Sequence, residues 1–410
     1  MALKHLAKRY IGTEESVWVV FTALARQHNA VNLGQGFPDY PDCVPLHVRK
    51  ALADVTMSDN ALMNQYTRGF GHPPLVQNLS KLYSKELKRE INAMDEILVT
   101  GGAYEALFCS FQSLLNEGDE VIIIEPFYDC YHPMAVTAGA TSKFVPLRPT
   151  GNGSSSGDWK IDPNELKQAF TPKTRLLIIN NPNNPLGKVY TQEELEMISK
   201  MCVENDILCI SDEVYEWMAI PPKKHLRIAN MPGMWERTVT IGSAGKTFST
   251  TGWKLGWAIG PKELIGCLQV AHQNCVYTCP TPTQQAAANG FETEIARFGQ
   301  PGCYFQSLAN DQLKPKRDLM VDVLKSSGFD PIVPEGGYFM MADWTKHKDL
   351  LPPPANDAEA KEANDVRFVK WMTSTHKLAT IPITCFFSEG HRSIGENYIR
   401  FCYIKVNIFN

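Results

Sequence analysis

Short aliphatic runs alternate with helical patterns through the middle of the chain. Apolar runs of four or five residues, closed by Gly, Pro or polar residues, are typical of strands buried on both faces. Such strands are predicted at residues 97–100, 120–124, 175–179 and 207–211, and helices at 104–115 and 191–204. The alternation predicts an α/β fold with a large, mostly parallel sheet.

The pattern changes after about residue 305. A long amphipathic helix is predicted over 308–325, a strand over 336–341 and a further helix over 366–375. These elements predict a second, smaller α+β domain, which the N-terminal segment completes. The expected division is 46–305 for the large domain, and 1–45 with 306–410 for the small domain.

A lone lysine, Lys246, follows the β-branched run 238–241 among small residues. Ser243 precedes it, and a second cation, Lys254, comes eight positions later. Ligands of open parallel sheets bind outside the carboxyl ends of the strands. A lysine in that place can form a Schiff base with a carbonyl cofactor, while a hydroxyl and a cation bind its phosphate.

Two other interpretations of this segment are possible. Gly245, Lys246 and Thr247 resemble the end of a nucleotide-binding P-loop, but that motif needs a glycine five residues before Gly245, where this chain has Thr240. The P-loop is therefore excluded. A solvated surface lysine after a buried strand stays open on this segment alone.

Two further strand ends carry groups that suit a flat, phosphorylated ligand. Gly102 and Ala103 lie between a predicted strand and helix, so the first free N–H groups of that helix can face an anion. Tyr128 follows the next strand and can stack on a heteroaromatic ring. The alternatives are tight packing for the glycine turn and ordinary core packing for the aromatic residue.

Amide and carboxylate groups follow the remaining two strands. The doubled Asn-Pro element at 180–187 fixes turns and orients amide side chains, which can donate to a phenolate-like oxygen. Asp212 comes after a buried strand, where a carboxylate is costly unless it meets a cation such as a protonated pyridine nitrogen. Tyr215, three residues later, is placed to hydrogen-bond an oxygen on the same ring.

The charge and composition of the chain argue against several classes of protein. The chain of 410 residues has a formal net charge of −4, which argues against a nucleic-acid binder. No apolar run reaches the roughly 18 residues of a membrane helix, and no apolar signal-peptide core is present. Eleven cysteines without a Cys-x-x-Cys pair, and scattered histidines, imply no metal. We expect a cytoplasmic protein, although the basic N-terminus leaves a mitochondrial location open.

Taken together, the motifs resemble the fold-type-I pyridoxal-phosphate aminotransferases over almost the whole chain. The sequence is most similar to the kynurenine aminotransferases, a family also described as glutamine transaminase K and cysteine-S-conjugate β-lyase. This narrower resemblance rests on segments 31–39, 64–67, 124–131, 183–188, 232–237 and 242–249.

The resemblance implies a role for each candidate residue. Lys246 would carry the cofactor, pyridoxal 5′-phosphate, and move a proton between substrate Cα and cofactor C4′. Asp212 would pair with the pyridine nitrogen, and Arg400 would bind the substrate α-carboxylate through both guanidinium nitrogens. The other cofactor contacts would be Gly102, Ala103, Tyr128, Asn184, Tyr215, Ser243 and Lys254, with Tyr66 from the partner subunit. The other substrate contacts would be Trp18, Gly36, Asn184 and Tyr277.

The implied activity is amino transfer from kynurenine, glutamine or another bulky neutral or aromatic amino acid to a 2-oxo acid, with kynurenic acid formed from kynurenine. The implied assembly is a homodimer with shared active sites. Two alternatives remain: a cysteine-S-conjugate β-lyase that uses the same site, and a non-catalytic binding protein on the same scaffold.

Two departures from the family pattern bear on function. Thr278 stands where relatives are expected to carry an imidazole, which bears on the choice of amino donor. The chain also ends ten residues after Arg400, where relatives are expected to continue into a further helix, so a truncated or alternatively spliced product is expected.

Overall fold

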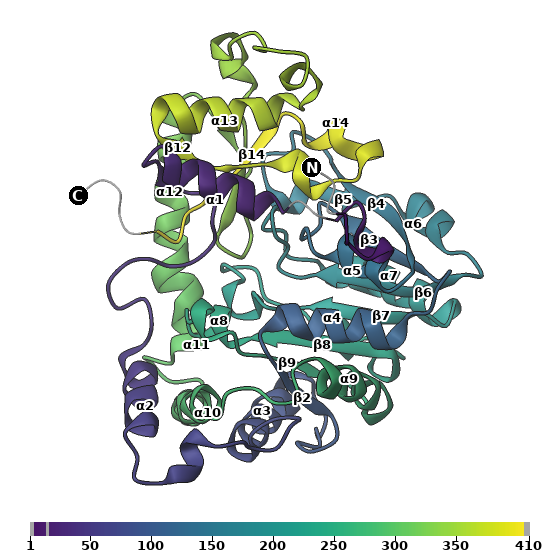
Figure 1. The fold of residues 1–410 in the computed structure, drawn as a ribbon, viewed down its shortest axis with the longest axis vertical. Coiled ribbons are helices and arrows are strands. Elements are labelled where there is room, and N and C mark those ends of the chain that lie inside the picture. The colour runs from purple at the N-terminus through teal and green to yellow at the C-terminus, as the bar shows by residue number, and fades with distance from the viewer. Residues whose placement is uncertain (1–3, 14–15, 406–410) are drawn as a thin grey trace.

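The computed structural model describes residues 4–13 and 16–405, and its largest element is an eight-stranded sheet (Figure 1). Five neighbouring strands run parallel, while the strands β9 and β5 are antiparallel to their neighbours. Across the sheet the order is β2 (Ile97–Thr100), β9 (Gly256–Ile259), β8 (Thr238–Ser243), β7 (Leu208–Asp212), β6 (Thr174–Asn180), β3 (Glu120–Glu125), β4 (Thr141–Pro149) and β5 (Trp159–Ile161).

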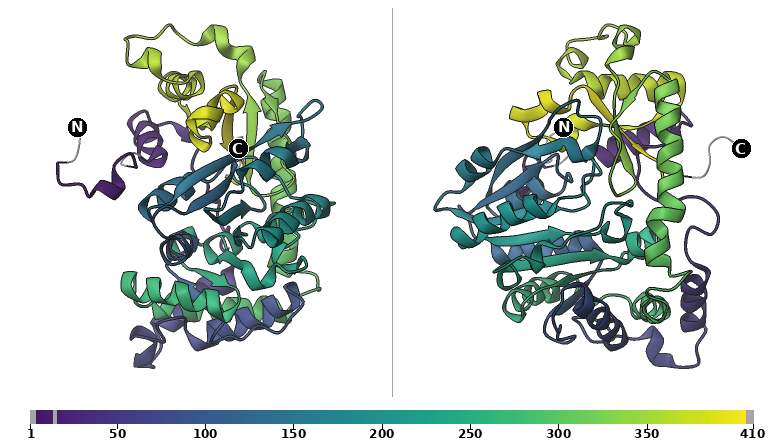
Figure 2. Two further views of the ribbon diagram at one scale, coloured as in Figure 1. Left: turned by 90° about the vertical axis from the view of Figure 1, so that its right-hand side faces the viewer. Right: turned by 180° about the vertical axis from the view of Figure 1, so that it is seen from behind.

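Helices lie on both sides of this sheet (Figure 2). The central strands are buried along their length, because the helices shield both faces from water. The helices of this part are α2 (Leu46–Thr56), α3 (Pro73–Glu86), α4 (Ala103–Leu114), α5 (Tyr131–Thr137), α6 (Pro163–Ala169), α7 (Gln192–Glu204), α8 (Ala244–Thr247), α9 (Lys262–Cys275) and α10 (Thr281–Ala296). The helices α2, α3 and α10 pack together at the end of the molecule opposite the second sheet (Figure 1).

The second sheet has four antiparallel strands, in the order β10 (Asp330–Pro331), β11 (Phe339–Asp343), β14 (Tyr398–Cys402) and β13 (Ile381–Pro382). A short parallel pair joins β1 (Val31–Asn32) to β12 (Leu378–Ala379). This pair brings the N-terminal segment to the C-terminal part, where α1 (Val17–Gln27) packs against α13 (Asn364–His376). The short helix α14 (Arg392–Gly395) precedes β14.

A long helix joins the two parts of the molecule. It begins with α11 (Tyr304–Ser307), continues through a π-helical segment (Leu308–Leu313) and ends with α12 (Lys314–Ser326), which runs along the side of the molecule in Figure 1. The boundaries at residues 45 and 305 stay a prediction.

The predicted elements of the middle region are confirmed. The four predicted strands correspond to β2, β3, β6 and β7, and their bounds differ by one residue at most. The helix predicted at 191–204 is α7, and Thr191 and Glu194 form its capping box. The strand predicted at 336–341 begins later, at Phe339, because Gly337 adopts a left-handed conformation with φ of +70°.

Two further findings concern the described residues only. None of their helices is both long and apolar enough to cross a membrane. They also contain no cluster of three or more histidine, cysteine, aspartate or glutamate side chains that could hold a metal ion. Residues 406–410, where the expected early ending falls, lie outside the described part.

Candidate active site

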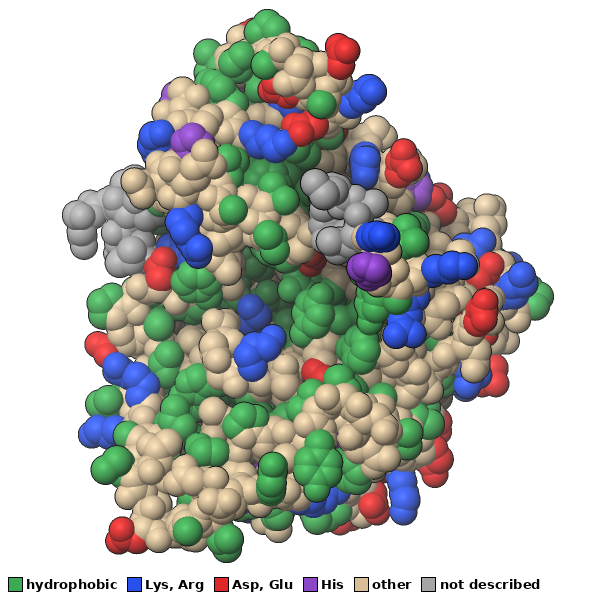
Figure 3. Space-filling view, viewed as in Figure 1, with side chains coloured by type: hydrophobic (Ala, Val, Ile, Leu, Met, Phe, Trp, Pro, Cys, Tyr) green, Lys and Arg blue, Asp and Glu red, His purple; other side chains and the backbone are tan. Residues whose placement is uncertain are grey.

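A cavity of about 420 Å³ opens where the two parts of the molecule meet. The space-filling view shows a recess near the middle of this face, where apolar side chains meet lysine or arginine side chains (Figure 3). A volume of this size suits a bound small molecule. Its lining includes eleven of the predicted site residues: Trp18, Gly36, Gly102, Ala103, Tyr128, Asn184, Asp212, Tyr215, Ser243, Lys246 and Lys254.

Lys246 comes from the short helix α8, directly after strand β8. Its Nζ donates a hydrogen bond of 2.6 Å to the hydroxyl of Tyr338, which in turn donates to the carbonyl oxygen of Gly36 at 2.9 Å. Burial lowers the pKa of Lys246 to about 8, so its neutral amine is far more populated near neutral pH than that of an ordinary lysine. A neutral amine in a cavity is suited to attack a carbonyl group, and the alternative of a solvated surface lysine is excluded.

Asp212 lies at the carboxyl end of strand β7 and is almost fully buried. Its Oδ2 accepts a hydrogen bond of 2.5 Å from the hydroxyl of Tyr131, and its Oδ1 accepts one of 3.3 Å from the N–H of Val214. Burial nevertheless raises the pKa of Asp212 to about 6. A cation close to this carboxylate would favour its charged form, as a protonated pyridine nitrogen does.

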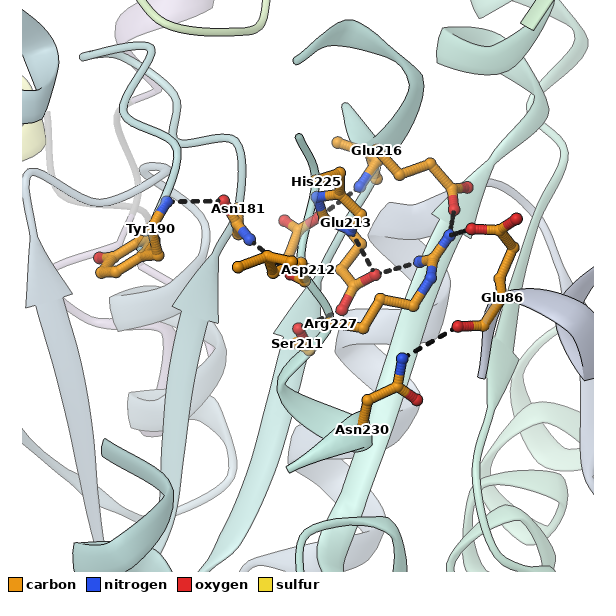
Figure 4. Close-up of polar contacts among 12 residues, drawn as sticks. Glu86, Asn181, Tyr190, Ser211, Asp212, Glu213, Glu216, His225, Arg227 and Asn230 are labelled. Carbon is orange, nitrogen blue, oxygen red and sulfur yellow. Dashed lines mark hydrogen bonds and ion pairs between the residues drawn. The ribbon is translucent and has the colours of Figure 1, made fainter. Parts of the chain in front are cut away.

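A buried ionic cluster lies behind Asp212 (Figure 4). The guanidinium of Arg227 pairs with Glu213, the residue after Asp212, and with Glu216 at 2.5 Å. His225 contacts the same Glu213 carboxylate at 2.8 Å, and Tyr83 donates to Glu216 at 2.5 Å. Burial alone would raise the pKa of Glu213, but Arg227 and His225 lower it below its usual value. The cluster fixes the turn after Asp212 with charged hydrogen bonds.

The guanidinium of Arg400 is fully buried at the centre of the second sheet, on strand β14. It donates to Asn184 Oδ1 at 2.7 Å and to the carbonyl oxygen of Gly34 at 2.6 Å, and the ring centroid of Phe339 lies 3.8 Å from its Cζ. No carboxylate of the described residues lies within ion-pair distance of Arg400, and its Nε has no hydrogen-bond partner there. Burial lowers the pKa of Arg400 to about 10. A buried arginine with a free N–H group suits a ligand carboxylate.

The turn before helix α4 forms an anion-binding corner. Gly102 has φ of +83°, and a Cβ atom on it would lie 3.5 Å from Nζ of Lys254. Strand β9 comes so close that a Cβ on Gly256 would lie 2.5 Å from the backbone nitrogen of Ala103. The N–H groups of Glu105 and Ala106 donate to the carbonyl oxygen of Gly102, which leaves those of Ala103 and Tyr104, at the start of α4, for an anion. With Ser243 in the same cavity, these groups fit a phosphate.

Aromatic side chains form the opposite wall. The ring centroids of Trp18 and Tyr128 are 6.4 Å apart, and the ring of Tyr215 lies edge-on to Tyr338 at 5.2 Å. A Cβ on Gly36 would lie only 2.2 Å from the ring of Phe339, so only glycine fits there. This wall is apolar and suits a large uncharged group.

Three predicted residues are absent from the cavity lining: Arg400 lies behind the lining residues Asn184 and Phe339, whereas Tyr66 and Tyr277 lie on the surface. Tyr66 is 84% exposed and Tyr277 is 63% exposed, and their ring centroids are 6.1 Å apart. Neither lines the cavity of its own chain. Their roles therefore stay predictions that depend on a partner subunit.

Sequence reasoning missed several side chains of the site. Tyr338 contacts Lys246, Tyr131 contacts Asp212 and Phe339 packs on Arg400. Tyr338 and Phe339 were assigned only to a predicted strand, and nothing local distinguishes them from core residues. Tyr131 lies in a segment that carries the family resemblance, which was the one signal available.

Comparison with known proteins places the chain in a family. The model of aminotransferase classes I and II matches residues 28–406. The chain is 53% identical to kynurenine--oxoglutarate transaminase 3 of Homo sapiens over 409 residues, which cover 99% of this chain and 88% of the relative. It is 46% identical to kynurenine--oxoglutarate transaminase 1 of Mus musculus over 405 residues, which cover 97% of this chain and 94% of the relative.

Solved structures agree with this assignment. N-succinyldiaminopimelate aminotransferase from Mycobacterium tuberculosis is 34% identical and superposes with a TM-score of 0.86, covering 98% of this chain and 96% of that one. Aspartate aminotransferase from Thermus thermophilus with maleate is 27% identical, with a TM-score of 0.82 and the same coverage. The predicted α/β fold of type I is confirmed, and the lysine, the buried carboxylate and the anion corner fit pyridoxal 5′-phosphate. The chain belongs to the class I and II aminotransferases and is a pyridoxal-phosphate-dependent aminotransferase.

Proposed function

We propose that this enzyme transfers the amino group of kynurenine, glutamine or another bulky neutral amino acid to a 2-oxo acid. The names of its relatives support kynurenine as a donor, whose keto product would cyclise to kynurenic acid. The observation that carries the proposal is the setting of Arg400, a buried guanidinium with a free N–H group beside an aromatic wall. Among the described residues, Lys246 and Lys254 are the cations of the cavity lining, and Arg400 lies directly behind the lining residues Asn184 and Phe339.

Pyridoxal phosphate supplies the aldehyde that accepts the amino group and a ring that withdraws electrons from substrate Cα. Lys246 would hold the cofactor and, once the substrate amine has taken its place, its free neutral amine would take up the proton that leaves substrate Cα. Its lowered pKa suits this task, since a protonated amine could not act as a base. Arg400 holds the substrate carboxylate and thereby fixes the position of Cα.

The remaining contacts follow from the lining of the cavity. Asp212 would pair with the pyridine nitrogen and keep it protonated, while Asn184 and Tyr215 would donate to the ring oxygen. Because Asn184 Oδ1 accepts from Arg400, its amide N–H groups remain as donors for that oxygen. Tyr128 stacks on the ring. The phosphate contacts are Gly102, Ala103, Ser243 and Lys254, and the substrate side chain lies against Trp18, Gly36 and, from the partner, Tyr277.

A homodimer would complete the site. Tyr66 and Tyr277 are large, exposed and in edge-to-face contact, and Leu62 is 67% exposed nearby in sequence, which supports an interface at this surface. Tyr66 would then reach the phosphate site of the partner subunit.

Mixed dimers test this arrangement. Lys246→Ala and Tyr66→Ala are each expected to be nearly inactive alone. Random hybrids of the two should regain roughly a quarter of the wild-type sites, since one site in each hybrid has both residues intact. Hybrids without recovered activity would show that Tyr66 does not act across an interface.

A screen of substrate pairs tests the proposed reaction. Kynurenine, glutamine and phenylalanine are offered as donors with several 2-oxo acids, and aspartate serves as an acidic control. We expect the three neutral donors to exceed aspartate at least tenfold in kcat/KM, because the apolar wall leaves a second carboxylate unpaired. A preference for aspartate would contradict the proposal. A cysteine conjugate offered in parallel measures lyase activity as pyruvate and ammonia.

The cytoplasm is the proposed compartment. All eleven cysteines are free in the structure, which agrees with a reducing environment. Fractionation of the native source with an antibody against this chain would test it.

A further inference from the structure

A buried carboxylate lies directly beside the anion-binding corner at the turn before helix α4. Glu105, in the first turn of helix α4, is 8% exposed, and its Oε2 accepts a hydrogen bond from the N–H of Gly101. This residue is two positions from Ala103, on the same turn that is proposed to bind the phosphate. A carboxylate in this place would repel a phosphate and offset the charge of Lys254 unless a cation compensated it.

His272 lies on the other side of this carboxylate. It comes from helix α9 and is completely buried. Its Nδ1 is 2.6 Å from Glu105 Oε1, and its Nε2 is 3.0 Å from the carbonyl oxygen of Gly69. Neither oxygen can donate a hydrogen bond when Glu105 is ionised, so both contacts are satisfied only if His272 carries a proton on each nitrogen. With one proton between Glu105 and Nδ1 of His272 and another on Nε2, the buried pair carries no net charge.

The same histidine orders the segment that carries the exposed tyrosines. Gly69 follows Tyr66 by three residues, and a Cβ on Gly69 would lie 3.0 Å from the carbonyl oxygen of Tyr277. The backbone N–H of Tyr277 donates to the carbonyl oxygen of His272 at 3.0 Å. His272 therefore connects Glu105 with both tyrosine segments, through its side chain to Gly69 and through its backbone carbonyl to Tyr277.

We propose that Glu105 and His272 act as a charge-balanced positioning pair for the cofactor phosphate. Glu105 holds the Gly101 N–H group and so sets the turn before helix α4. His272 cancels the charge of Glu105, so that the field of Lys254 and of the helix N-terminus reaches the phosphate undiminished. The proposal rests on the phosphate contacts proposed above and on no assumption about the substrate.

The test compares two ligands that differ only in the phosphate. Affinities of the cofactor-free protein for pyridoxal phosphate and for pyridoxal are measured by equilibrium titration of absorbance, and inorganic phosphate is titrated as a competitor. Three variants are used: His272→Gln, Glu105→Gln and the double variant. His47→Gln is the matched control, because His47 forms a 3.1 Å pair with the buried Glu294 and neither residue lines the cavity.

The expected results differ between a role in charge and a role in packing. His272→Gln leaves the carboxylate uncompensated, so binding of pyridoxal phosphate and of inorganic phosphate should weaken about tenfold while pyridoxal binding changes little. Glu105→Gln and the double variant have no such charge, so their preference for the phosphorylated ligand should stay within about threefold of wild type. The control should not change this preference.

Other outcomes would overturn the proposal. If His272→Gln weakens both ligands equally, or if the double variant is worse than either single one, the pair serves packing alone. If His272→Gln does not fold while the double variant does, the uncompensated carboxylate is the cause, which supports the proposal. If neither folds, a packing role is shown and the proposal fails. The substrate screen is independent of these results, so failure here leaves the proposed reaction standing.

Discussion

Replacing Asp212 by asparagine should stabilise the cofactor-free protein and weaken its binding of the cofactor. Burial raises the pKa of Asp212 from 3.8 to about 6 in the folded protein. The folded state therefore binds this proton more tightly than the unfolded chain does, so stability is lost as pH rises from about 4 to about 6. Asparagine does not titrate, and the variant avoids this loss.

The magnitude follows from the shift. A difference of roughly two pKa units corresponds to about 3 kcal/mol of unfolding free energy at pH 8, and to about half as much at pH 5. The amide preserves the local contacts, because its oxygen can accept from the N–H of Val214 while its NH₂ group donates to the hydroxyl of Tyr131. With the cofactor present the sign reverses, since the variant cannot pair with a protonated pyridine nitrogen.

Urea unfolding of the cofactor-free protein at pH 5 and pH 8 measures the effect, and cofactor titration measures the loss of binding. Tyr131→Phe is the matched control, because it removes a hydrogen bond that favours the charged carboxylate and should destabilise the cofactor-free protein at pH 8. The reasoning is refuted if the asparagine variant is no more stable than wild type at pH 8, or if its advantage does not shrink toward pH 5.

Three further substitutions give separate tests. Arg400→Lys should raise KM for both the amino donor and the 2-oxo acid by about tenfold or more, since lysine cannot make a bidentate contact. Steady-state kinetics measure both KM values, and a rise in only one of them would contradict a shared carboxylate site. Arg227→Met should lower the free energy of unfolding by about 3–5 kcal/mol, because two buried carboxylates lose their cation. Urea titrations measure this free energy, and a loss below about 1 kcal/mol would contradict the role of Arg227 in the buried cluster. Gly256→Ala should weaken the binding of pyridoxal phosphate more than that of pyridoxal, because its Cβ would press on the backbone of Ala103. Gly266→Ala is the control, since a Cβ there meets nothing within 4 Å and Gly266 does not line the cavity. Equal losses for both ligands would refute the argument.

The strands and the cofactor side of the cavity could be predicted because their signals are local. A strand of a parallel sheet that is buried on both faces carries a continuous apolar run, and β3, β6 and β7 contain such runs at 121–124, 176–179 and 208–210. The carboxyl ends of such strands meet at one edge of the sheet, so Lys246 and Asp212 could be assigned to one site before any coordinates.

The other contacts depend on pairings between distant parts of the chain. Tyr338 reaches Lys246, and Phe339 packs on Arg400, only because β11 pairs with β14 and the second sheet faces the first. His272 and Glu105 are 167 residues apart in sequence. No local pattern marks such contacts, and a buried histidine resembles any other core residue in the sequence.

The cavity takes its two walls from separate elements of the fold. The groups for the cofactor come from the strand ends of the eight-stranded sheet, whereas Trp18 and Phe339 come from helix α1 and strand β11. Substitutions at Trp18 and Phe339 can therefore alter the preferred amino acid without touching the groups that hold the cofactor. Because the two walls are separate, a few mutations can change which amino acid the enzyme prefers as donor. Directed evolution of the enzyme can begin at those two positions.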